Sequence, residues 1–268
     1  MGNSRPLALV TGASSGIGAT FARHLAAEGY DLVLVARRAE RLRELAGELN
    51  ARHGIHAEAL PADLTRDDDV SQIASLLATS PDLALLVNNA GFGSRGYLFE
   101  VDPSAQADMH RLHVLATVRL TQAAVGGMVE RDHGAIINVS SVAGFIQGPG
   151  NISYCATKTW MNSFTEGLAM ELASLRSAVV VQALCPGYTY SEFHDVMGAD
   201  RGEIPRSLWL DADFVVAESL KGLRTRKLFV IPGWRYRALV RIIALMPRGL
   251  LQAAARRVRK PRDKMKSA

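Results

Sequence analysis

Short apolar runs along the chain alternate with longer stretches in which apolar residues recur every three or four positions. Uninterrupted apolar runs are typical of strands buried on both faces, and the second spacing is typical of amphipathic helices. We therefore expect strands over residues 7–10, 32–35, 57–60, 83–87, 135–139, 178–184 and 228–231. Helices are expected between them over residues 17–30, 42–54, 70–77, 103–129 and 152–175.

This alternation predicts an α/β fold: a single domain around a doubly wound parallel sheet of about seven strands, flanked by helices. Strands buried on both faces need helices on both sides, which a repeated strand–helix order supplies. Such a sheet binds ligands beyond the carboxyl ends of its strands, where the strand order reverses. Residues that follow the predicted strands are therefore the first candidates for a functional site.

A glycine-rich segment, residues 11–18, separates the first predicted strand from the first helix. Its glycines allow a tight turn and a close approach of a pyrophosphate, which the following helix N-terminus attracts. Packing of the turn is the alternative explanation for glycines at this place. We expect a dinucleotide to bind on Gly12, Ser14, Ser15, Gly16, Ile17 and Gly18.

Two arginines, Arg37 and Arg38, follow the second predicted strand, where NAD-binding sites usually place an acid on the ribose hydroxyls. Guanidinium groups suit the 2′-phosphate of NADP, which an acid would repel. We therefore expect NADP(H) as the cofactor rather than NAD(H). Asp63 and Leu64 are candidates for the adenine end, although Asp63 equally fits a turn that caps the next helix.

Tyr154 and Lys158 stand four residues apart in a predicted helix, so they share one face about one turn apart. A nearby ammonium group favours tyrosinate and lowers the pKa of tyrosine from its usual value of about 10. Such a tyrosine can exchange a proton with an alcohol oxygen near neutral pH. Ser141 ends the fifth predicted strand, where its hydroxyl could hydrogen-bond a substrate carbonyl. The spacing alone is also common on helix surfaces.

Taken together, these motifs resemble the short-chain dehydrogenase/reductase family from about residue 7 to residue 191. Residues 11–18 match the family's glycine loop, and residues 88–91, Asn-Asn-Ala-Gly, match a motif that stabilises the sheet and lines the nicotinamide ribose. The resemblance implies a Rossmann-type fold and three groups of site residues: Asn89, Ala90 and Gly91 beside the ribose; the catalytic Ser141, Tyr154 and Lys158; and Pro186, Gly187 and Thr189 in the loop that holds the carboxamide.

His113 departs from the family's pattern, because the family usually has an asparagine there that holds a water of the proton relay. An imidazole could hold that water or act as the relay itself, since histidine titrates near pH 6.5. The alternatives are a histidine that packs the helix, or a relay through a backbone carbonyl alone. His113 is therefore a candidate catalytic residue.

The resemblance also implies reversible hydride transfer at a carbonyl carbon, with Tyr154 supplying the proton. With NADPH we expect reduction of a ketone to a secondary alcohol. One alternative is an NAD(P)-dependent alcohol dehydrogenase that works in the oxidative direction. The other is a catalytically weak protein that senses nucleotides or interacts with membranes.

In the family, the segment after the sixth strand closes over the substrate, and here it spans about residues 188–222. Its apolar content favours an apolar substrate, such as a 3-oxoacyl chain or a ketosteroid, although packing of a lid helix explains it as well. The residues concerned are Tyr190, Phe193, Met197, Ile204, Leu208 and Trp209. By resemblance, the helices over 103–129 and 152–175 predict a homodimer or homotetramer.

Composition narrows the class of protein further. The 268 residues are 48% apolar and 21% charged, as in an ordinary globular domain. Two cysteines are too few for a disulfide framework or a four-ligand zinc site, and we expect no metal. We see no signal sequence, no myristoylation motif and no bilayer-length apolar run, and therefore expect a cytoplasmic protein.

Positive charge is concentrated at the C-terminal end. Residues 221–268 hold 15 of the 31 lysines and arginines and one acid, so they carry +14 while the remainder carries −9. We expect a cofactor-binding and catalytic domain over residues 1–232 and a basic amphipathic extension over 233–268. An apolar stripe of Leu239, Ile242, Ile243 and Met246 predicts either contact of residues 234–260 with an anionic membrane or packing within the protein. Nucleic acid is the least favoured partner.

Overall fold

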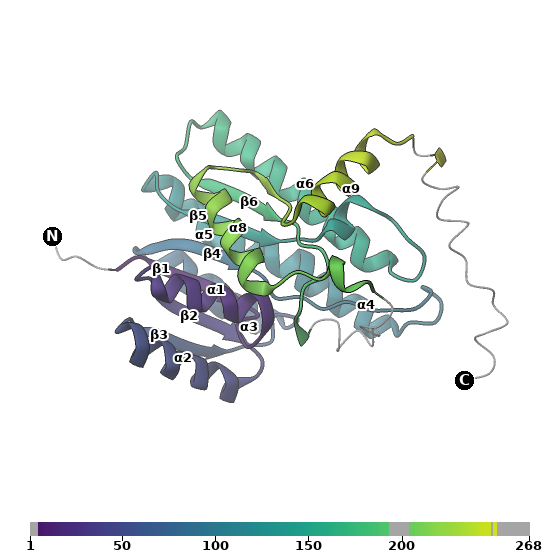
Figure 1. Cartoon of the computed structure of the whole chain (residues 1–268). Coiled ribbons are helices and arrows are strands. Elements are labelled where there is room, and N and C mark those ends of the chain that lie inside the picture. Colours follow the sequence, from purple (N-terminus) through teal and green to yellow (C-terminus); the bar gives the residue numbers. More distant parts are fainter. Residues whose placement is uncertain (1–4, 193–203, 248, 251–268) are drawn as a thin grey trace.

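The computed structural model describes residues 5–192, 204–247 and 249–250 (Figure 1). Within these residues, seven strands form one sheet whose neighbouring strands are all parallel. The order across the sheet is β3-β2-β1-β4-β5-β6-β7, which confirms the predicted doubly wound α/β fold. The strands are β1 (Leu7–Thr11), β2 (Asp31–Ala36), β3 (Ala57–Pro61), β4 (Leu83–Asn88), β5 (Ala135–Val139), β6 (Val180–Leu184) and β7 (Phe229–Val230).

The strand order reverses between β1 and β4, and this is where a crevice forms at the carboxyl ends of the strands. Val10 of β1 pairs with Val87 of β4, and Thr11 pairs with Val35 of β2. The glycine loop after β1 therefore lies between the ends of β2 and β4. Of the predicted strands, β6 begins two residues later than expected and β7 is reduced to two residues.

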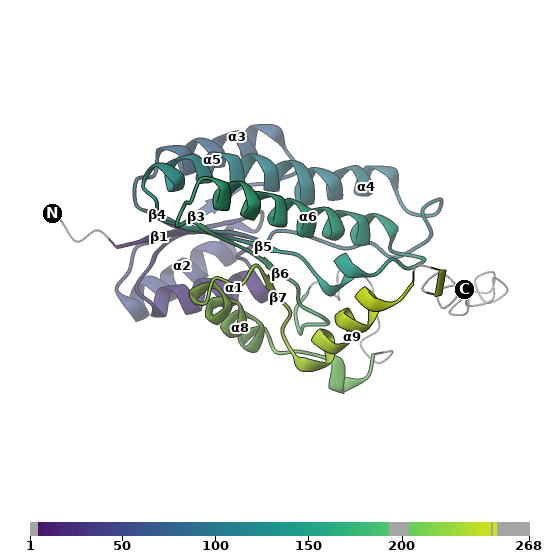
Figure 2. The same ribbon diagram turned by 90° about the horizontal axis from the view of Figure 1, so that it is seen from above.

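Helices cover both faces of the sheet (Figure 2). One layer contains α1 (Gly16–Ala27), α2 (Ala39–His53) and α8 (Ala212–Arg224). The other contains α3 (Asp67–Thr79), α4 (Pro103–His110), α5 (Thr117–Glu130) and α6 (Ile152–Ser174). Along β2, Leu34 packs into the core of the first layer and Val33 into that of the second. Burial on both faces explains why the strands are continuous apolar runs.

The helix predicted over residues 103–129 is not uniform, because a π-helical segment, η1 (Arg111–Ala116), joins α4 to α5. The spacing of apolar residues does not distinguish a π-helical turn from an α-helical one, so the sequence did not predict this segment. Turns of the π type are frequent at functional sites. By length and composition the whole stretch Pro103–Glu130 could also cross a bilayer. Leu120 and Ala124 are nevertheless buried in the core beneath the sheet, as in the core helix of a globular protein.

The final long helix, α9 (Trp234–Leu245), packs beside a short 3₁₀ segment, η2 (Val142–Phe145), and next to the loop after β6. Tyr236 and Val240 form its buried face. The four residues of the predicted apolar stripe differ in burial. Leu239 and Ile242 are exposed to solvent, whereas Ile243 and Met246 are half-buried. Residues 251–260 of the predicted membrane segment lie outside the described residues.

Candidate active site

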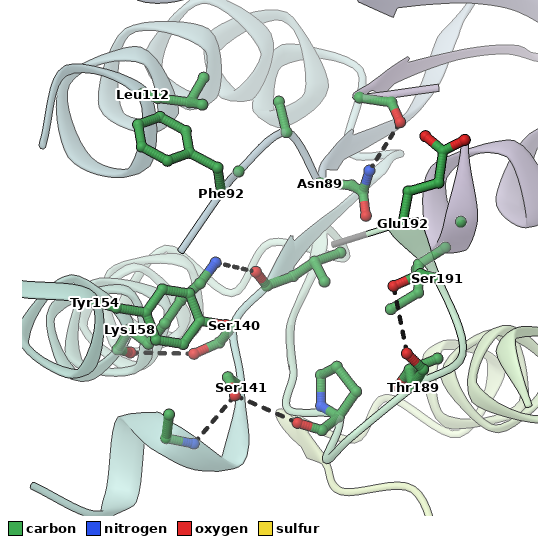
Figure 3. Close-up of a pocket in the computed structure, with 18 of the residues that line it drawn as sticks. Asn89, Phe92, Leu112, Ser140, Ser141, Tyr154, Lys158, Thr189, Ser191 and Glu192 are labelled. Carbon is green, nitrogen blue, oxygen red and sulfur yellow. Dashed lines mark hydrogen bonds between the residues drawn. The ribbon is translucent and has the colours of Figure 1, made fainter. Parts of the chain in front are cut away.

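A pocket of about 900 Å³ lies at the carboxyl ends of the strands, at the switch point. Its lining runs from the glycine loop and Arg38 at one end, through Asn89, to Tyr154 and α9 at the other. Figure 3 shows Glu192 beside the N-terminal elements and Tyr154 with Lys158 on the opposite wall. Side chains from segments far apart in sequence therefore meet in one cavity.

The glycine loop is shaped by close backbone approaches. Gly12 and Gly16 have φ angles of +66° and +54°, a region that favours glycine. A Cβ added at Gly18 would lie 2.3 Å from the carbonyl oxygen of Gly12, so no side chain fits there. The N-terminus of α1 follows directly, and its free N–H groups face the pocket end where Ser14, Ser15, Gly16 and Ile17 line the wall. This geometry suits a pyrophosphate.

The residues after β4 are fixed to β1 by hydrogen bonds. The backbone N–H groups of Asn89 and Ala90 donate to Thr11 Oγ1 at 2.9 and 3.0 Å, and Asn89 Nδ2 donates to the Thr11 carbonyl at 2.8 Å. Asn89, Ala90 and Gly91 all line the pocket. The motif therefore joins the two strands that border the crevice.

Arg38 is held at the far end of the pocket by the hydroxyls of the glycine loop. Its Nη2 donates to Ser14 Oγ at 2.9 Å and to Ser15 Oγ at 2.8 Å. Its Nη1 donates to Glu192 Oε2 at 2.7 Å. Arg37 lines the same end of the pocket. Two guanidinium groups are thus available where the ribose of a dinucleotide would lie.

Asp63 forms a turn at the end of β3. Its Oδ1 accepts hydrogen bonds from the backbone N–H of Thr65 at 3.1 Å and from Thr65 Oγ1 at 2.8 Å. Burial raises the pKa of Asp63, but the hydrogen bonds from Thr65 together with the charges of Arg37 and Arg66 outweigh it, and the net shift is downward. Asp63 and Leu64 also line the pocket, so the turn and the pocket wall are formed by the same residues.

Tyr154, Lys158 and Ser141 converge on the centre of the pocket. Tyr154 and Lys158 are buried on one face of α6, with Lys158 Nζ 5.7 Å from the centre of the tyrosine ring. Lys158 Nζ donates to the carbonyl of Val139 at 2.7 Å, which fixes it against β5. Ser141 hydrogen-bonds with Tyr154. Ser140 points away, donating its hydroxyl to the Lys158 carbonyl at 3.1 Å.

The expectation that Lys158 lowers the pKa of Tyr154 is not met in the protein alone. Burial raises the pKa of Tyr154 above its usual value, and the hydrogen bond with Ser141 only partly opposes this. Burial also lowers the pKa of Lys158 to about 8. The lysine therefore carries a reduced positive charge near pH 8, which weakens its effect on the phenol.

His113 is fully buried with its ring edge-on to that of Tyr154, the ring centres 5.9 Å apart, and it is not among the described residues that line the pocket. Its Nε2 accepts the backbone N–H of Phe92 at 3.1 Å. Its Nδ1 lies 2.9 Å from Thr157 Oγ1, which itself donates to the Tyr154 carbonyl. Nδ1 must therefore carry the proton, and the imidazole is neutral. Burial first, then Lys158 and His110, hold the pKa of His113 well below its usual value. Both ring nitrogens therefore have protein partners, which favours the helix-packing alternative over a relay through the imidazole.

The loop after β6 is shaped by α9. A Cβ added at Gly187 would lie 2.0 Å from Tyr236 Cζ, so the glycine is required by the tyrosine. Tyr236 Oη donates to the Leu208 carbonyl at 2.6 Å and accepts the backbone N–H of Tyr188 at 3.1 Å. Pro186, Gly187 and Thr189 line the pocket as expected. Helix α9 therefore fixes the position of this loop on the pocket wall.

The substrate end of the pocket is apolar, but mostly through residues that the sequence did not single out. Of the six expected residues, Ile204 lines the pocket. Tyr190 instead stacks on the buried Trp209, with the two ring centres 4.9 Å apart. Neither of these two residues lines the pocket, and Leu208 does not line it either. Phe193 and Met197 lie outside the described residues. The apolar wall is formed by Phe92, Leu112, Ile146, Tyr188, Tyr236 and Leu239.

Comparison with known proteins assigns this geometry to a family. Residues 6–202 match the family model described as short chain dehydrogenase. The chain is 33% identical over 198 residues to the 3-oxoacyl-[acyl-carrier-protein] reductase FabG of Staphylococcus aureus (strain Mu50 / ATCC 700699), covering 73% of this chain and 79% of that protein.

Two solved structures bear on the cofactor. A short-chain dehydrogenase from Sphingobium yanoikuyae in complex with NADPH has a TM-score of 0.82 and 35% identity, covering 91% of this chain and 97% of that one. A short-chain dehydrogenase/reductase from Burkholderia phymatum in complex with NAD has a TM-score of 0.79 and 25% identity, covering 89% and 92%. Similar folds thus bind either dinucleotide.

Proposed function

Because the chain belongs to the short-chain dehydrogenase/reductase family of oxidoreductases, we propose that it is an NADPH-dependent reductase that converts a lipophilic ketone into a secondary alcohol. The observation that carries this proposal is the convergence of Ser141, Tyr154 and Lys158 on a pocket whose far end holds Arg38 against Ser14 and Ser15.

The pocket fits an NADP(H) molecule. Gly12 and Gly18 let the β1–α1 loop pack tightly against Asn89, although Gly18 does not itself line the pocket. The N–H groups at the N-terminus of α1 would bind a pyrophosphate there. Arg37 and Arg38 offer charge-assisted hydrogen bonds to a 2′-phosphate, a group that NADH lacks. These arginines are the reason for proposing NADPH over NADH.

The chain's own residues can perform acid catalysis on a carbonyl. Bound NADPH would supply the hydride. Tyr154 Oη would donate the proton to the carbonyl oxygen, and Ser141 Oγ would hydrogen-bond that oxygen and hold it in place. Burial keeps the phenol protonated, which is the form that a reductase needs at this step. Lys158, fixed on the Val139 carbonyl, would hold the ribose and the tyrosine.

The apolar wall supports a lipophilic substrate. Phe92, Leu112, Ile146 and Leu239 surround the space beyond Tyr154, and burying apolar surface there would favour an acyl chain or a fused ring system. The similarity to a 3-oxoacyl reductase supports the acyl chain. Oxidation of a lipophilic alcohol uses the same residues in reverse.

Substitution of Tyr154 by phenylalanine tests the proposed reaction. We expect turnover to fall by about 10²–10⁴, because the proton donor is lost. The NADPH dissociation constant should stay within about twofold, since the ring still fills its place. Tyr97→Phe, outside the pocket, is the matched control. Substrates should include 3-oxoacyl thioesters, ketosteroids, medium-chain ketones and small polar aldehydes, each with NADPH and NADH.

The outcomes of this assay separate the alternatives. NADPH-dependent turnover of the lipophilic members supports the proposal, and turnover of small polar aldehydes alone would remove the lipophilic substrate. Equal turnover by Tyr154→Phe and the parent would remove the assigned acid. Tight binding of NADPH without turnover of any compound in either direction would favour a non-catalytic nucleotide-binding protein.

We also propose that the protein is a cytoplasmic homo-oligomer that touches an anionic membrane surface through α9. Exposed Met170 on α6 and exposed Leu175 directly after that helix support a subunit contact along it. Exposed Trp234, Ile242 and Leu245 on α9, interspersed with arginines, support the membrane contact.

A further inference from the structure

Glu192 connects the loop after β6 to the two arginines that begin α2. Its Oε2 accepts from Arg38 Nη1 at 2.7 Å, and its Oε1 accepts from Arg41 Nη1 at 2.5 Å. Each carboxylate oxygen is thus paired with a different guanidinium group. Hydrogen bonds from Arg38 and then Arg41 lower the pKa of Glu192 to about 2, so it stays ionised throughout the range of an enzyme assay.

The position of Glu192 is supported by its own segment. A Cβ added at Gly16 would lie 2.9 Å from Ser191 Cβ, so this segment lies directly against the glycine loop. Ser191 Oγ donates to the Thr189 carbonyl at 3.3 Å, which stabilises the turn before Glu192. Glu192 lines the pocket together with Arg37, Arg38 and Ser14. Its side chain lies on the opposite side of the pocket from Tyr154 and Lys158 (Figure 3).

We propose that Glu192 competes with the 2′-phosphate of NADPH for Arg38 and thereby limits the affinity for NADPH relative to NADH. The inference rests on the proposed use of NADPH. A phosphate that approaches Arg38 meets a carboxylate on the same guanidinium group, so it must displace that carboxylate or share the arginine with it at the cost of like-charge repulsion. NADH carries no charge at this position and meets no such competition.

Arg38 does not depend on Glu192 for its place. Ser14 and Ser15 accept three hydrogen bonds from its Nε and Nη2 atoms, between 2.8 and 3.1 Å. Removing the carboxylate charge should therefore leave the guanidinium group where it is and let its Nη1 bond the phosphate without a competing negative charge. Replacing Glu192 by glutamine keeps the shape and removes the charge, which makes it the decisive variant.

The test measures dissociation constants for NADPH and NADH by titration of the cofactor in the parent, Glu192→Gln and Glu48→Gln. Glu48, on α2, pairs with Arg23 of α1 at 3.2 Å and does not line the pocket, so its variant controls for the loss of one negative charge. We expect Glu192→Gln to bind NADPH about threefold to tenfold more tightly, in line with an exposed ion pair. Binding of NADH should change by less than about twofold, and Glu48→Gln should match the parent.

Adding Arg38→Ala to Glu192→Gln should abolish the gain, because the competition is for that arginine. Unchanged or weaker NADPH binding in Glu192→Gln, while the parent still prefers NADPH, would overturn the competition and leave the proposed cofactor intact. Equal binding of both cofactors by the parent and by Glu192→Gln would overturn the choice of NADPH, and the competition with it.

Discussion

At the scale of single residues, His113 connects two segments of the chain that border the pocket. Its two ring nitrogens join Phe92, in the loop after β4, to Thr157 on the catalytic helix. A Cβ added at Gly91 would lie 2.7 Å from Nε2, so the neighbouring glycine makes room for the ring. The imidazole therefore ties the cofactor loop to the turn that carries Tyr154.

Burial of a neutral histidine makes stability depend on pH. The pKa of His113 is lowered in the folded state, so below the unfolded-state value of about 6.5 the unfolded chain binds a proton that the folded chain excludes. Stability from this group is complete above that pH and is lost as pH falls. The free energy of unfolding falls between pH 7 and pH 5, and this fall should be smaller in His113→Asn than in the parent protein by about 1–2 kcal/mol.

Urea denaturation at pH 5, 6, 7 and 8 measures this difference, with exposed His133→Asn as the control. At pH 7 the His113 variant should itself be less stable by about 1–3 kcal/mol, because Thr157 and the Phe92 N–H lose a partner. Parallel pH profiles for the parent and His113→Asn would contradict the buried neutral imidazole. A step in the pH profile of kcat/KM that disappears in the variant would restore the relay.

At the scale of elements, the sequence was most informative where local pattern and tertiary environment agree. β1 to β5 and α6 lie within a few residues of their predicted bounds because double-sided burial and helical spacing leave distinct patterns. Ser141, Tyr154 and Lys158 could be placed together because the carboxyl ends of parallel strands share one edge.

Other features depend on contacts between distant segments and leave no local signal. The π turn at Arg111–Ala116 accommodates the partners of His113, and the buried face of α9 is set by the loop that Tyr236 contacts. Glu192 was missed because nothing in its neighbours along the chain indicates two arginines more than 150 residues earlier. The upward pKa shift of Tyr154 likewise reflects burial, which residue spacing does not reveal.

The exposed face of α6 predicts self-association. Met170 is 65% exposed, and the half-buried rings of Trp160 and Phe164 stack at 4.9 Å on the same helix. We expect Met170→Glu to shift the protein from a dimer or tetramer toward its 29.0 kDa subunit, because a charge would be buried at the contact. Light scattering coupled to size exclusion measures this, with Met170→Leu as the control. A parent that elutes as a single subunit would contradict the contact.

At the scale of the whole molecule, charge and apolar surface coincide on one helix. α9 exposes Trp234, Ile242 and Leu245, and between them Arg235, Arg237 and Arg241 carry positive charge with no acid in the helix. The guanidinium group of Arg235 lies 5.3 Å from the Trp234 ring centre. This combination suits the interface of an anionic bilayer.

Co-sedimentation with vesicles tests this contact. We expect binding to vesicles that contain phosphatidylserine, weaker binding to pure phosphatidylcholine, and a decrease as salt rises, because the attraction is partly electrostatic. Ile242→Glu should reduce the bound fraction by at least about threefold, whereas Phe214→Glu, on α8, should not. Binding that ignores both lipid charge and Ile242 would contradict a role for α9.

The place of α9 at the end of the chain has a consequence for synthesis. A ribosome delivers the N-terminal segments first, so the glycine loop, Arg38 and β4 emerge long before Tyr236 and Leu239. The nucleotide half of the crevice can therefore assemble on the nascent chain while the opposite wall is still untranslated. We expect a premature stop codon shortly before α9 to yield a product that keeps the glycine loop and Arg38 yet lacks the pocket wall formed by Tyr236 and Leu239.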